Sequence, residues 1–180
     1  MEIIGEAYRE LQNLVKLYAK EDLPVLFIGE TGTGKELFMS LYMKENKKRS
    51  GKKMTINCAA LSDDLLRSEV FGHAKGAFTG AVTPRKGKIA TCKDGILALD
   101  EIGDATPEFQ AAILRVCEAS SFSHLGSDEE IQTNTLIIAA TNKPENLRHD
   151  LKERFHVLPI PPLQKEDIPS LAQHFLKKPL

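Results

Sequence analysis

Five stretches along the chain have the length and apolar content of strands, and longer stretches with helical spacing separate them. The strand candidates lie near residues 25–28, 54–57, 96–99, 135–140 and 157–160. Short, mostly apolar runs without polar alternation are typical of strands buried on both faces. We therefore expect a three-layer α/β fold, in which a five-stranded, mostly parallel sheet is covered by helices on both faces.

The helix with the clearest start begins at Thr106-Pro107-Glu108. This triplet combines a capping hydroxyl, a proline at the first helical position and an acid in the first turn. Other helices are expected over the N-terminal stretch, with Ala7, Leu11, Leu14, Val15 and Tyr18 on one face, over about 37–43, over 63–70 with Ser62 as its N-cap, and over about 165–177.

Composition indicates an ordinary globular protein. The chain has 180 residues, of which 42% are hydrophobic and 27% are charged, and its formal net charge is -1. That charge argues against a domain whose main task is to neutralise the phosphates of a duplex. A single nucleotide remains possible, because it needs only a local cradle.

The cysteines and apolar runs give the expected compartment. Cys58, Cys92 and Cys117 are odd in number and lack CxxC spacing, which disfavours a disulfide framework or a zinc site. No signal peptide precedes the first amphipathic stretch, and no apolar run reaches about 18 residues. We expect a cytoplasmic protein with no membrane partner.

A glycine-rich segment after the first strand matches the pattern G-x-x-x-x-G-K. Backbone N–H groups there would point at phosphate oxygens, and Lys35 would reach the β- and γ-phosphates. A simple turn is the alternative, but a strand before and a helix after are the context that the motif requires. Glu36 replaces the usual Mg²⁺-binding hydroxyl and is not assigned as a ligand. The candidate nucleotide-binding residues are Gly29, Glu30, Thr31, Gly32, Thr33, Gly34, Lys35 and Glu36.

Asp100 and Glu101 end the third apolar run. In P-loop NTPases an aspartate at such a strand end holds Mg²⁺, and a neighbouring glutamate can orient the attacking water. Alone, the pair would be interpreted as a solvated strand end. Together with the phosphate cradle it indicates an ATPase that uses ATP and Mg²⁺, with Asp100 as the metal-binding residue.

Further along the chain, polar residues carry weaker signals. Thr141-Asn142 ends the fourth strand, where a polar side chain can reach the γ-phosphate or the lytic water, although these residues also suit a turn. Arg148 and Arg154 lie six residues apart near a short predicted helix and do not share a face. Either arginine could contact a neighbouring subunit's phosphate, make a structural pair or be a solvated charge.

The segment from Gly76 to Ala81 lies between the cradle and the acidic pair. Gly76 and Gly80 permit tight turns on either side of Ala77, Phe78 and Thr79. An aromatic side chain in such a loop indicates either a packed loop or a contact site, and the residues alone leave both possibilities open.

The chain closely resembles the AAA+ ATPase domain of bacterial sigma-54-dependent transcriptional activators. The G-A-F-T-G-A element is close to diagnostic, and G-K-E in place of G-K-[ST] is also what this family shows. The matching segments follow the family order over nearly the whole chain: GETGTGKE at 29–36, NCAAL at 57–61, FGHAKGAFTGA at 71–81, DGILALDEIGD at 94–104, LIIAATN at 136–142, LRHDLKERF at 147–155 and PPL at 161–163.

The resemblance implies a ring ATPase, usually a homohexamer, which uses ATP hydrolysis to remodel the closed complex of sigma-54 RNA polymerase holoenzyme. DNA would be bound only through a separate domain. It implies that Gly76, Ala77, Phe78, Thr79, Gly80 and Ala81 form the sigma-54 contact, with Phe78 and Thr79 touching it. It further implies that Asn57 links Glu101 to nucleotide state, that Thr141-Asn142 is sensor I, and that Arg148 and Arg154 face the neighbouring subunit's nucleotide.

The sequence also departs from the family pattern. Ala74 replaces a frequent glutamate, Leu136 replaces a common arginine, and Gln164 and Lys165 replace an arginine-rich continuation. We expect the helical lid, which would hold sensor II, to be nearly absent from this chain. We expect an AAA+ core over 1–163 and the start of a truncated lid over 164–180, with weak nucleotide binding and poor self-assembly of this chain alone.

The leading functional hypothesis is therefore an ATP-hydrolysing activator domain. The alternative is a nucleotide-sensing or oligomerisation module of the same fold that does not hydrolyse ATP. A general AAA+ chaperone or replication loader would share the ATPase motifs, but it has no reason to carry G-A-F-T-G-A.

Overall fold

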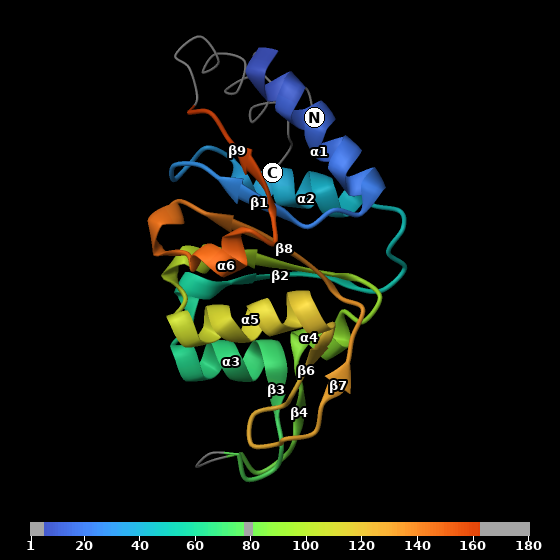
Figure 1. The fold of residues 1–180 in the computed structure, drawn as a ribbon, viewed down its shortest axis with the longest axis vertical. Coiled ribbons are helices and arrows are strands. Elements are labelled where there is room, and N and C mark those ends of the chain that lie inside the picture. Colours follow the sequence, from blue (N-terminus) through green and yellow to red (C-terminus); the bar gives the residue numbers. More distant parts are fainter. Residues whose placement is uncertain (1–5, 78–80, 163–180) are drawn as a thin grey trace, which may run out of the picture.

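A five-stranded sheet forms the centre of the computed structural model, which describes residues 6–77 and 81–162 (Figure 1). Its strand order is β2-β5-β8-β1-β9, and every neighbouring pair is parallel. All five expected strands are present: β1 (Val25–Ile28), β2 (Lys53–Asn57), β5 (Ile96–Asp100), β8 (Leu136–Thr141) and β9 (His156–Pro159).

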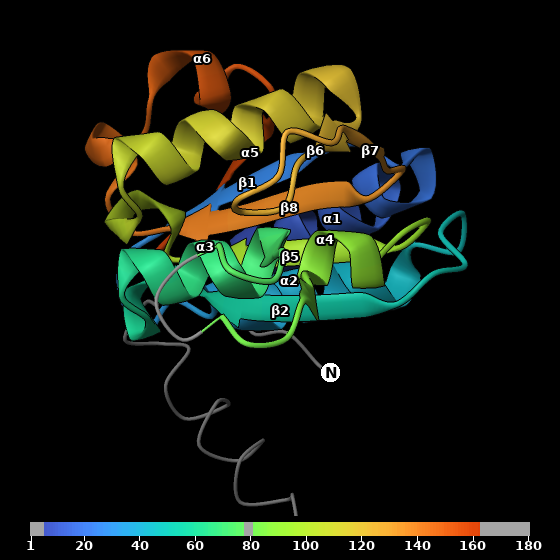
Figure 2. The same cartoon turned by 90° about the horizontal axis from the view of Figure 1, so that it is seen from below.

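Helices cover both faces of the sheet and complete the three layers that the sequence predicts (Figures 1 and 2). One face carries α1 (Glu6–Glu21) and α2 (Lys35–Glu45). The other face carries α3 (Asp63–Phe71), α4 (Lys88–Thr91), α5 (Pro107–Ala119) and α6 (His149–Lys152).

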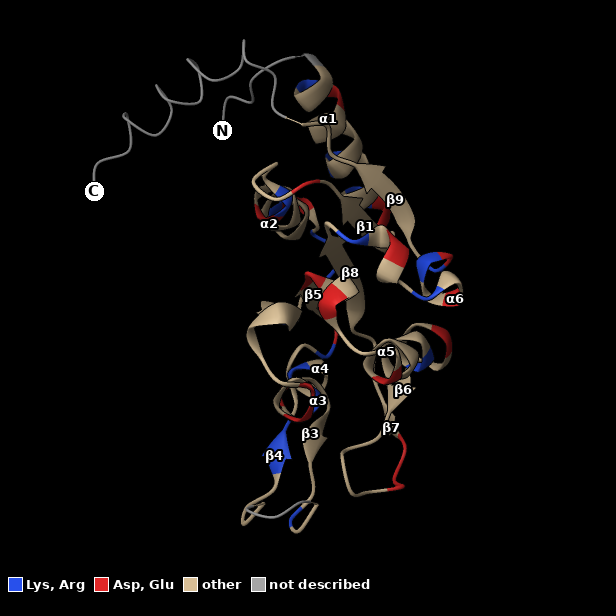
Figure 3. Cartoon of the chain, turned by 90° about the vertical axis from the view of Figure 1, so that its left-hand side faces the viewer, with Lys and Arg blue, Asp and Glu red and all other residues tan. Residues whose placement is uncertain are grey.

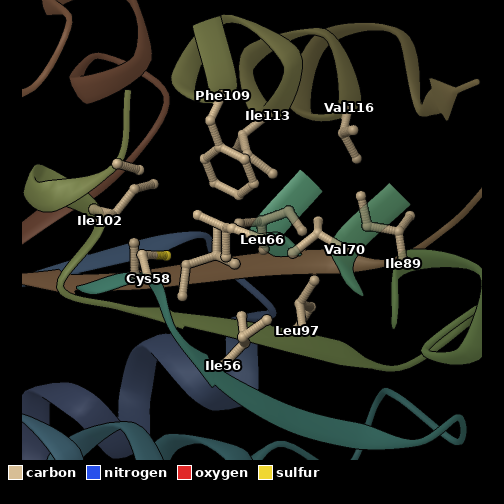
Figure 4. Close-up of a cluster of buried hydrophobic side chains, with 14 of the residues drawn as sticks. Ile56, Cys58, Leu66, Val70, Ile89, Leu97, Ile102, Phe109, Ile113 and Val116 are labelled. Atoms are coloured by element: carbon tan, nitrogen blue, oxygen red, sulfur yellow. The ribbon is translucent and has the colours of Figure 1, made fainter. Parts of the chain in front are cut away.

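Alternate residues of the central strands divide the core into two clusters, because successive strand side chains point to opposite faces. Val25 and Phe27 pack with the first pair of helices, whereas Leu26 packs with the second group. Figure 4 shows this second cluster, in which Phe109 and Ile113 of α5 face Leu97 of β5. The central strands β1, β5 and β8 are buried on both faces, which explains why they appear in the sequence as unbroken apolar runs.

The face of α1 that is buried differs from the one expected. Tyr8, Leu11, Val15 and Ala19 are buried against the sheet and α2. Ala7 and Leu14 are exposed, so assigning them to the packed face was wrong. The helix itself is confirmed. Helical spacing of three and four residues is compatible with both the expected face and the face that is buried, and tertiary packing decides which of the two meets the core.

The starts of α3 and α5 are confirmed, but only one has the expected cap. The Thr106 hydroxyl accepts a bond from the Phe109 amide, as a capping residue should. Ser62 occupies the N-cap position of α3 as expected, but its side chain makes no capping hydrogen bond. Instead, the Thr106 hydroxyl also donates to Asp63 at 2.6 Å and ties the starts of the two helices together.

Two short hairpins lie beyond the helical layer, side by side in Figure 1. In one, β3 (Gly72–His73) pairs with β4 (Arg85–Lys86) and encloses the G-A-F-T-G-A segment. In the other, β6 (Ser121–Phe122) pairs with β7 (Ile131–Gln132), and a bridge between His73 and Leu125 joins the two hairpins. Short 3-10 turns complete the fold: η1 (Cys58–Ala60), η2 (Ile102–Asp104) and η3 (Pro144–Asn146).

Some sequence expectations lie outside the described residues. These are the contacts of Phe78, Thr79 and Gly80, the last expected helix and the lid segment that contains Gln164 and Lys165. Within 6–77 and 81–162, no helix is both long enough and apolar enough to cross a membrane.

Candidate nucleotide site

The carboxyl ends of the parallel strands bring the separate sequence motifs to one edge of the sheet. The glycine-rich segment follows β1, the acidic pair ends β5, and Thr141-Asn142 ends β8. The Gly29 amide donates to the Thr141 carbonyl at 3.2 Å, which joins the first and third of these segments. Figure 3 shows the acidic positions beside the end of β5. Crevices at this edge are where open α/β sheets bind ligands.

The glycine-rich segment forms a tight loop that opens α2. Gly32 and Gly34 have φ angles of 85° and 87°, a left-handed conformation that glycine adopts at little cost. At Gly29, an added Cβ would lie 2.7 Å from the Thr33 hydroxyl, so even a methyl group would force a shift. The loop leads directly into the N-terminus of α2, where unpaired backbone amides and the helix dipole favour binding of an anion.

Lys35 is folded back over this loop and almost fully buried. Its side chain is only 7% exposed, and Nζ donates to the carbonyls of Gly29 at 3.0 Å and Glu30 at 3.3 Å. The same Nζ lies 3.2 Å from Glu101 Oε1. The phosphate cradle and the acidic pair, 65 residues apart in sequence, therefore meet through one ion pair.

Glu101 is held at both carboxylate oxygens. Oε1 faces Lys35, and Oε2 accepts a hydrogen bond from the backbone N–H of Asn142 at 3.1 Å. Its backbone is left-handed, with φ 50° and ψ 45°. Such a conformation is uncommon for a residue with a side chain. Strained backbone of this kind often marks a functional position.

Asn142, rather than Thr141, presents its side chain to the phosphate loop. Asn142 Nδ2 donates to the Thr31 hydroxyl at 3.0 Å, and Asn142 Oδ1 is buried with no hydrogen-bond partner in the described part of the chain. Thr141 is fully buried, and its hydroxyl accepts from the Lys143 amide at 2.9 Å. The Thr141 side chain therefore shapes the turn, while Asn142 has an acceptor available for another group.

Asp100 lies beside Glu101 at the edge of the sheet. Burial, together with the negative charge of Glu101, raises the pKa of the Asp100 carboxyl above its ordinary value. Asn57 Nδ2 is 3.5 Å from Asp100 Oδ2, and Asn57 Oδ1 accepts from the Ala59 amide at 2.9 Å. In this structure Asn57 thus contacts Asp100, whereas the partners of Glu101 are Lys35 and Asn142.

A divalent cation fits the chemistry of these residues. Asp100 is a half-buried carboxylate whose charge is disfavoured by its surroundings, and a cation would relieve that penalty. Mg²⁺ commonly uses one or two protein carboxylates together with phosphate oxygens and water. The exposed Glu36 adds negative charge that raises the pKa of Asp100 further.

The two predicted trans-acting arginines lie away from the cradle, one before and one after α6. Arg148 forms a two-point ion pair with Asp150, with Nε–Oδ1 at 3.0 Å and Nη2–Oδ2 at 2.6 Å. Arg154 pairs with Glu118 of α5. Both arginine side chains are about half exposed. The site of this chain therefore contains neither arginine, and both are available at the surface.

The stems of the G-A-F-T-G-A segment are held by specific polar contacts. The Gly76 amide donates to the Ala81 carbonyl at 2.9 Å and closes the base of the segment. Below it, the buried His73 ring lies 2.9 Å from the Ser68 hydroxyl through Nδ1 and 3.0 Å from the Thr83 carbonyl through Nε2. Gly126 of the second hairpin packs so closely that an added Cβ would lie 2.7 Å from Ala77 Cβ.

Sequence reasoning missed Gln110. This residue sits among the apolar positions of α5 and is only 1% exposed. Its side-chain amide makes three hydrogen bonds to backbone groups, one in the segment after the acidic pair and two in the segment that contains Asn146 and Arg148. The only signal in the sequence is a glutamine directly after Phe109, where the helical pattern allows either a core or a surface position.

Known sequences match nearly the whole chain. A family described as the Sigma-54 interaction domain matches residues 3–161. The Nif-specific regulatory protein of Rhizobium leguminosarum bv. trifolii is 40% identical, over 98% of this chain and 54% of that protein. The anaerobic nitric oxide reductase transcription regulator NorR of Aliivibrio fischeri is 42% identical, over 99% of this chain and 37% of that protein. The chain thus spans about half or less of these relatives.

Solved structures show the same fold. NtrX from Brucella abortus, crystallised with ADP, superposes with a TM-score of 0.86 at 26% identity, over 98% of this chain and 41% of that chain. NtrX crystallised with ATP also gives a TM-score of 0.86, at 27% identity, with the same coverage.

Proposed function

The chain belongs to the Sigma-54 interaction domain family, which consists of AAA+ ATPase domains, and from that membership we propose that it hydrolyses ATP to remodel the sigma-54 RNA polymerase closed complex. One observation carries the catalytic part of this proposal. Lys35 of the phosphate loop, Glu101 of the acidic pair and Asn142 at the end of β8 form one connected cluster. A domain that only sensed nucleotide would not need a carboxylate held in a strained conformation beside the cradle.

The loop at residues 29–36 would bind the phosphates of ATP through its amides and the amino group of Lys35. In this structure the amino group of Lys35 forms an ion pair with Glu101 and donates hydrogen bonds to two backbone carbonyls. A bound γ-phosphate would compete for that charge. Nucleotide binding would thereby weaken the hold on Glu101, so one event would both fill the cradle and release the carboxylate.

Glu101 is the proposed base that orients and deprotonates the attacking water. The backbone N–H of Asn142 would continue to hold Glu101 Oε2. The side-chain Oδ1 of Asn142, which has no partner among the described residues, could accept a hydrogen bond from that water. Asp100 would hold Mg²⁺, whose positive charge would stabilise the phosphoryl oxygens. Asn57 would act on this cluster through Asp100, its contact in this structure.

Arg148 and Arg154 are proposed to complete the site of the neighbouring subunit in a ring of identical subunits, expected to be a hexamer. A guanidinium supplied in trans offsets charge that develops on the transferred phosphoryl group and ties hydrolysis to assembly. Support comes from their place at the surface, where both side chains are about half exposed and pair with Asp150 and Glu118 rather than with residues of the cradle.

The G-A-F-T-G-A segment is proposed to contact sigma-54. Its stems are fixed by β3, β4 and the His73 contacts, so the segment projects from an ordered base. DNA binding would belong to a separate domain. The division of labour is that Phe78 and Thr79 serve coupling, while Lys35 and Glu101 serve hydrolysis and, through it, coupling.

The test combines ATP turnover with open-complex formation by sigma-54 polymerase, using the full-length protein. Glu101→Gln should lose both activities. Thr79→Ala should keep turnover and lose open-complex formation. Thr83→Ala, just outside the segment, serves as the matched control and should keep both. If Glu101→Gln and Thr79→Ala both retain activation, the proposal is wrong.

A non-hydrolysing regulatory module is the second candidate. It is favoured by the pairing of both arginines with acids of their own chain, which gives a stable resting arrangement. That candidate predicts saturable ATP binding by the wild-type protein with no phosphate release at any protein concentration.

A further inference from the structure

Gln110 connects the segment after the acidic pair with the segment that carries Arg148. Its Nε2 donates to the Ala105 carbonyl at 3.0 Å and to the Asn146 carbonyl at 3.2 Å. Its Oε1 accepts from the Arg148 amide at 2.9 Å. The partners fix the orientation of the side-chain amide, because a flipped amide would place its oxygen against two carbonyls.

Two of these bonds hold the backbone on either side of Leu147, one at the Asn146 carbonyl and one at the Arg148 amide. Asn146 ends η3, and Arg148 is the N-cap of α6, so the two residues flank Leu147 in the short connection between these helical turns. The amide of Gln110 closes this turn from within the core. Because it is almost completely buried, no solvent competes for its bonds, and leaving the partners unpaired would be costly.

The other end of the connection lies next to the acidic pair. Ala105 follows η2, which begins directly after Glu101. The same helix that carries Gln110 also carries Glu118, the partner of Arg154. The helix α5 therefore contacts the segments of both arginines, and it begins at Pro107, six residues after Glu101.

We propose that Gln110 is a positioning residue for Arg148, which it fixes for use in the neighbouring subunit's nucleotide site. This inference rests on the proposed role of Arg148 in trans. The three described hydrogen-bond partners of the Gln110 side chain are all backbone groups. It holds the backbone from which the guanidinium extends, and it links that backbone to the turn beside Glu101. Each subunit's acidic pair is thereby mechanically connected to the arginine that it offers to the next subunit.

The test uses Gln110→Met, which keeps the length and volume of the side chain but removes all three hydrogen bonds. The expected result is an ATP turnover number lowered about 10- to 100-fold with little change in KM, because small misplacements of a catalytic group have effects of this size. Ile113→Val is the matched control: it lies one turn further along α5, is fully buried and has an aliphatic side chain, which makes no hydrogen bond to either arginine segment. It should retain turnover, which separates positioning from a general loosening of the helix.

A mixing experiment decides whether the defect acts in trans. Lys35→Ala subunits have a disabled cradle but an intact Gln110 and Arg148, so they should restore turnover to Gln110→Met subunits in mixed rings. Loss of turnover in Gln110→Met that is restored by mixing supports the inference. Loss that is not restored, or no loss at all, overturns it. If Gln110→Met does not unfold cooperatively, the same measurements with Gln110→Asn, which is one methylene too short to reach all partners, decide between these outcomes.

Arg148→Ala distinguishes a failure of this inference from a failure of the proposed function. If wild-type protein does not turn over ATP, or if Arg148→Ala remains active, the underlying function is wrong. If Arg148→Ala is inactive and restored by mixing while Gln110→Met remains fully active, only the positioning role of Gln110 is wrong.

Discussion

The amino group of Lys35 lies 3.2 Å from Glu101 Oε1, so the residue proposed to bind phosphate and the residue proposed to activate water share one charge contact. Lys35→Ala and Glu101→Gln should therefore impair different steps, ATP binding in the first variant and hydrolysis in the second. Lys35→Ala should abolish detectable ATP binding. Glu101→Gln should bind ATP at least as tightly as wild type, because its Lys35 is free for phosphate, and should lose about 10²- to 10⁴-fold in turnover.

Fluorescent nucleotide titration and phosphate release measure the two effects separately. Glu108→Gln is the matched control, because Glu108 is an exposed acid in the first turn of α5. Weaker ATP binding by Glu101→Gln than by wild type would contradict the shared-charge interpretation.

Asp100 should cost the protein stability at neutral pH. Its pKa is raised above 3.8 by burial first and then by the charge of Glu101. The folded state then binds more protons than the unfolded state between the two pKa values, so stability falls as pH rises through that window. Asp100→Asn should raise Tm at pH 7–8 by about 2–4 °C, equivalent to about 1 kcal/mol.

This gain should shrink as the pH falls through the raised pKa of Asp100, because the wild-type carboxyl then becomes protonated and neutral as well. Thermal melts across pH 4–8 measure it, with the exposed Asp128→Asn as the control. A gain that is the same at every pH would show that charge is not its cause.

Thr106 should contribute more to stability than Ser62, although both occupy N-cap positions. The Thr106 hydroxyl bonds the Phe109 amide and Asp63, whereas Ser62 makes no capping bond. Thr106→Val should lose about 1–2 kcal/mol, as removal of a functional cap does. Ser62→Ala should change stability by less than about 0.5 kcal/mol. Urea denaturation of both, with the exposed Thr55→Val as a control, checks the difference; equal losses would contradict it.

Asp150 should restrain Arg148 in the resting chain. The two-point pair holds the guanidinium against its own subunit, although both side chains are about half exposed. Asp150→Asn should raise ATP turnover of the assembled protein by no more than about five-fold, since exposed ion pairs are weak. Phosphate release at several protein concentrations measures this, with Glu153→Gln as a neighbouring exposed control. A fall in turnover would mean that Asp150 helps to present Arg148.

The layers and the nucleotide loop could be predicted from sequence because their causes are local. Buried strands need unbroken apolar runs, and a phosphate loop needs glycines at fixed spacing. The two hairpins could not be predicted, because strands of two residues such as Arg85–Lys86 carry no detectable periodicity. The roles of Thr141 and Asn142 could not be separated either, because only the turn geometry decides which side chain faces the loop.

Contacts between distant segments were the least predictable part of the site. Gln110 reaches Asn146 and Arg148, which lie 36 and 38 residues further along the chain. Nothing in the local pattern of α5 marks this reach. In the same way, the pairing of Arg154 with Glu118 depends on how α5 and α6 pack, not on either sequence stretch alone.

Because the backbone of Glu101 is left-handed, the amino acid found at position 101 indicates whether hydrolysis or stability has been selected there. Glycine or asparagine would suit φ 50° better than glutamate does. A descendant that had abandoned turnover would gain stability by accepting either residue, and nothing would oppose the exchange. Chemistry and folding thus favour different amino acids at this position. Among relatives of this chain, the residue found there should therefore separate lineages that still consume ATP from those that only bind it.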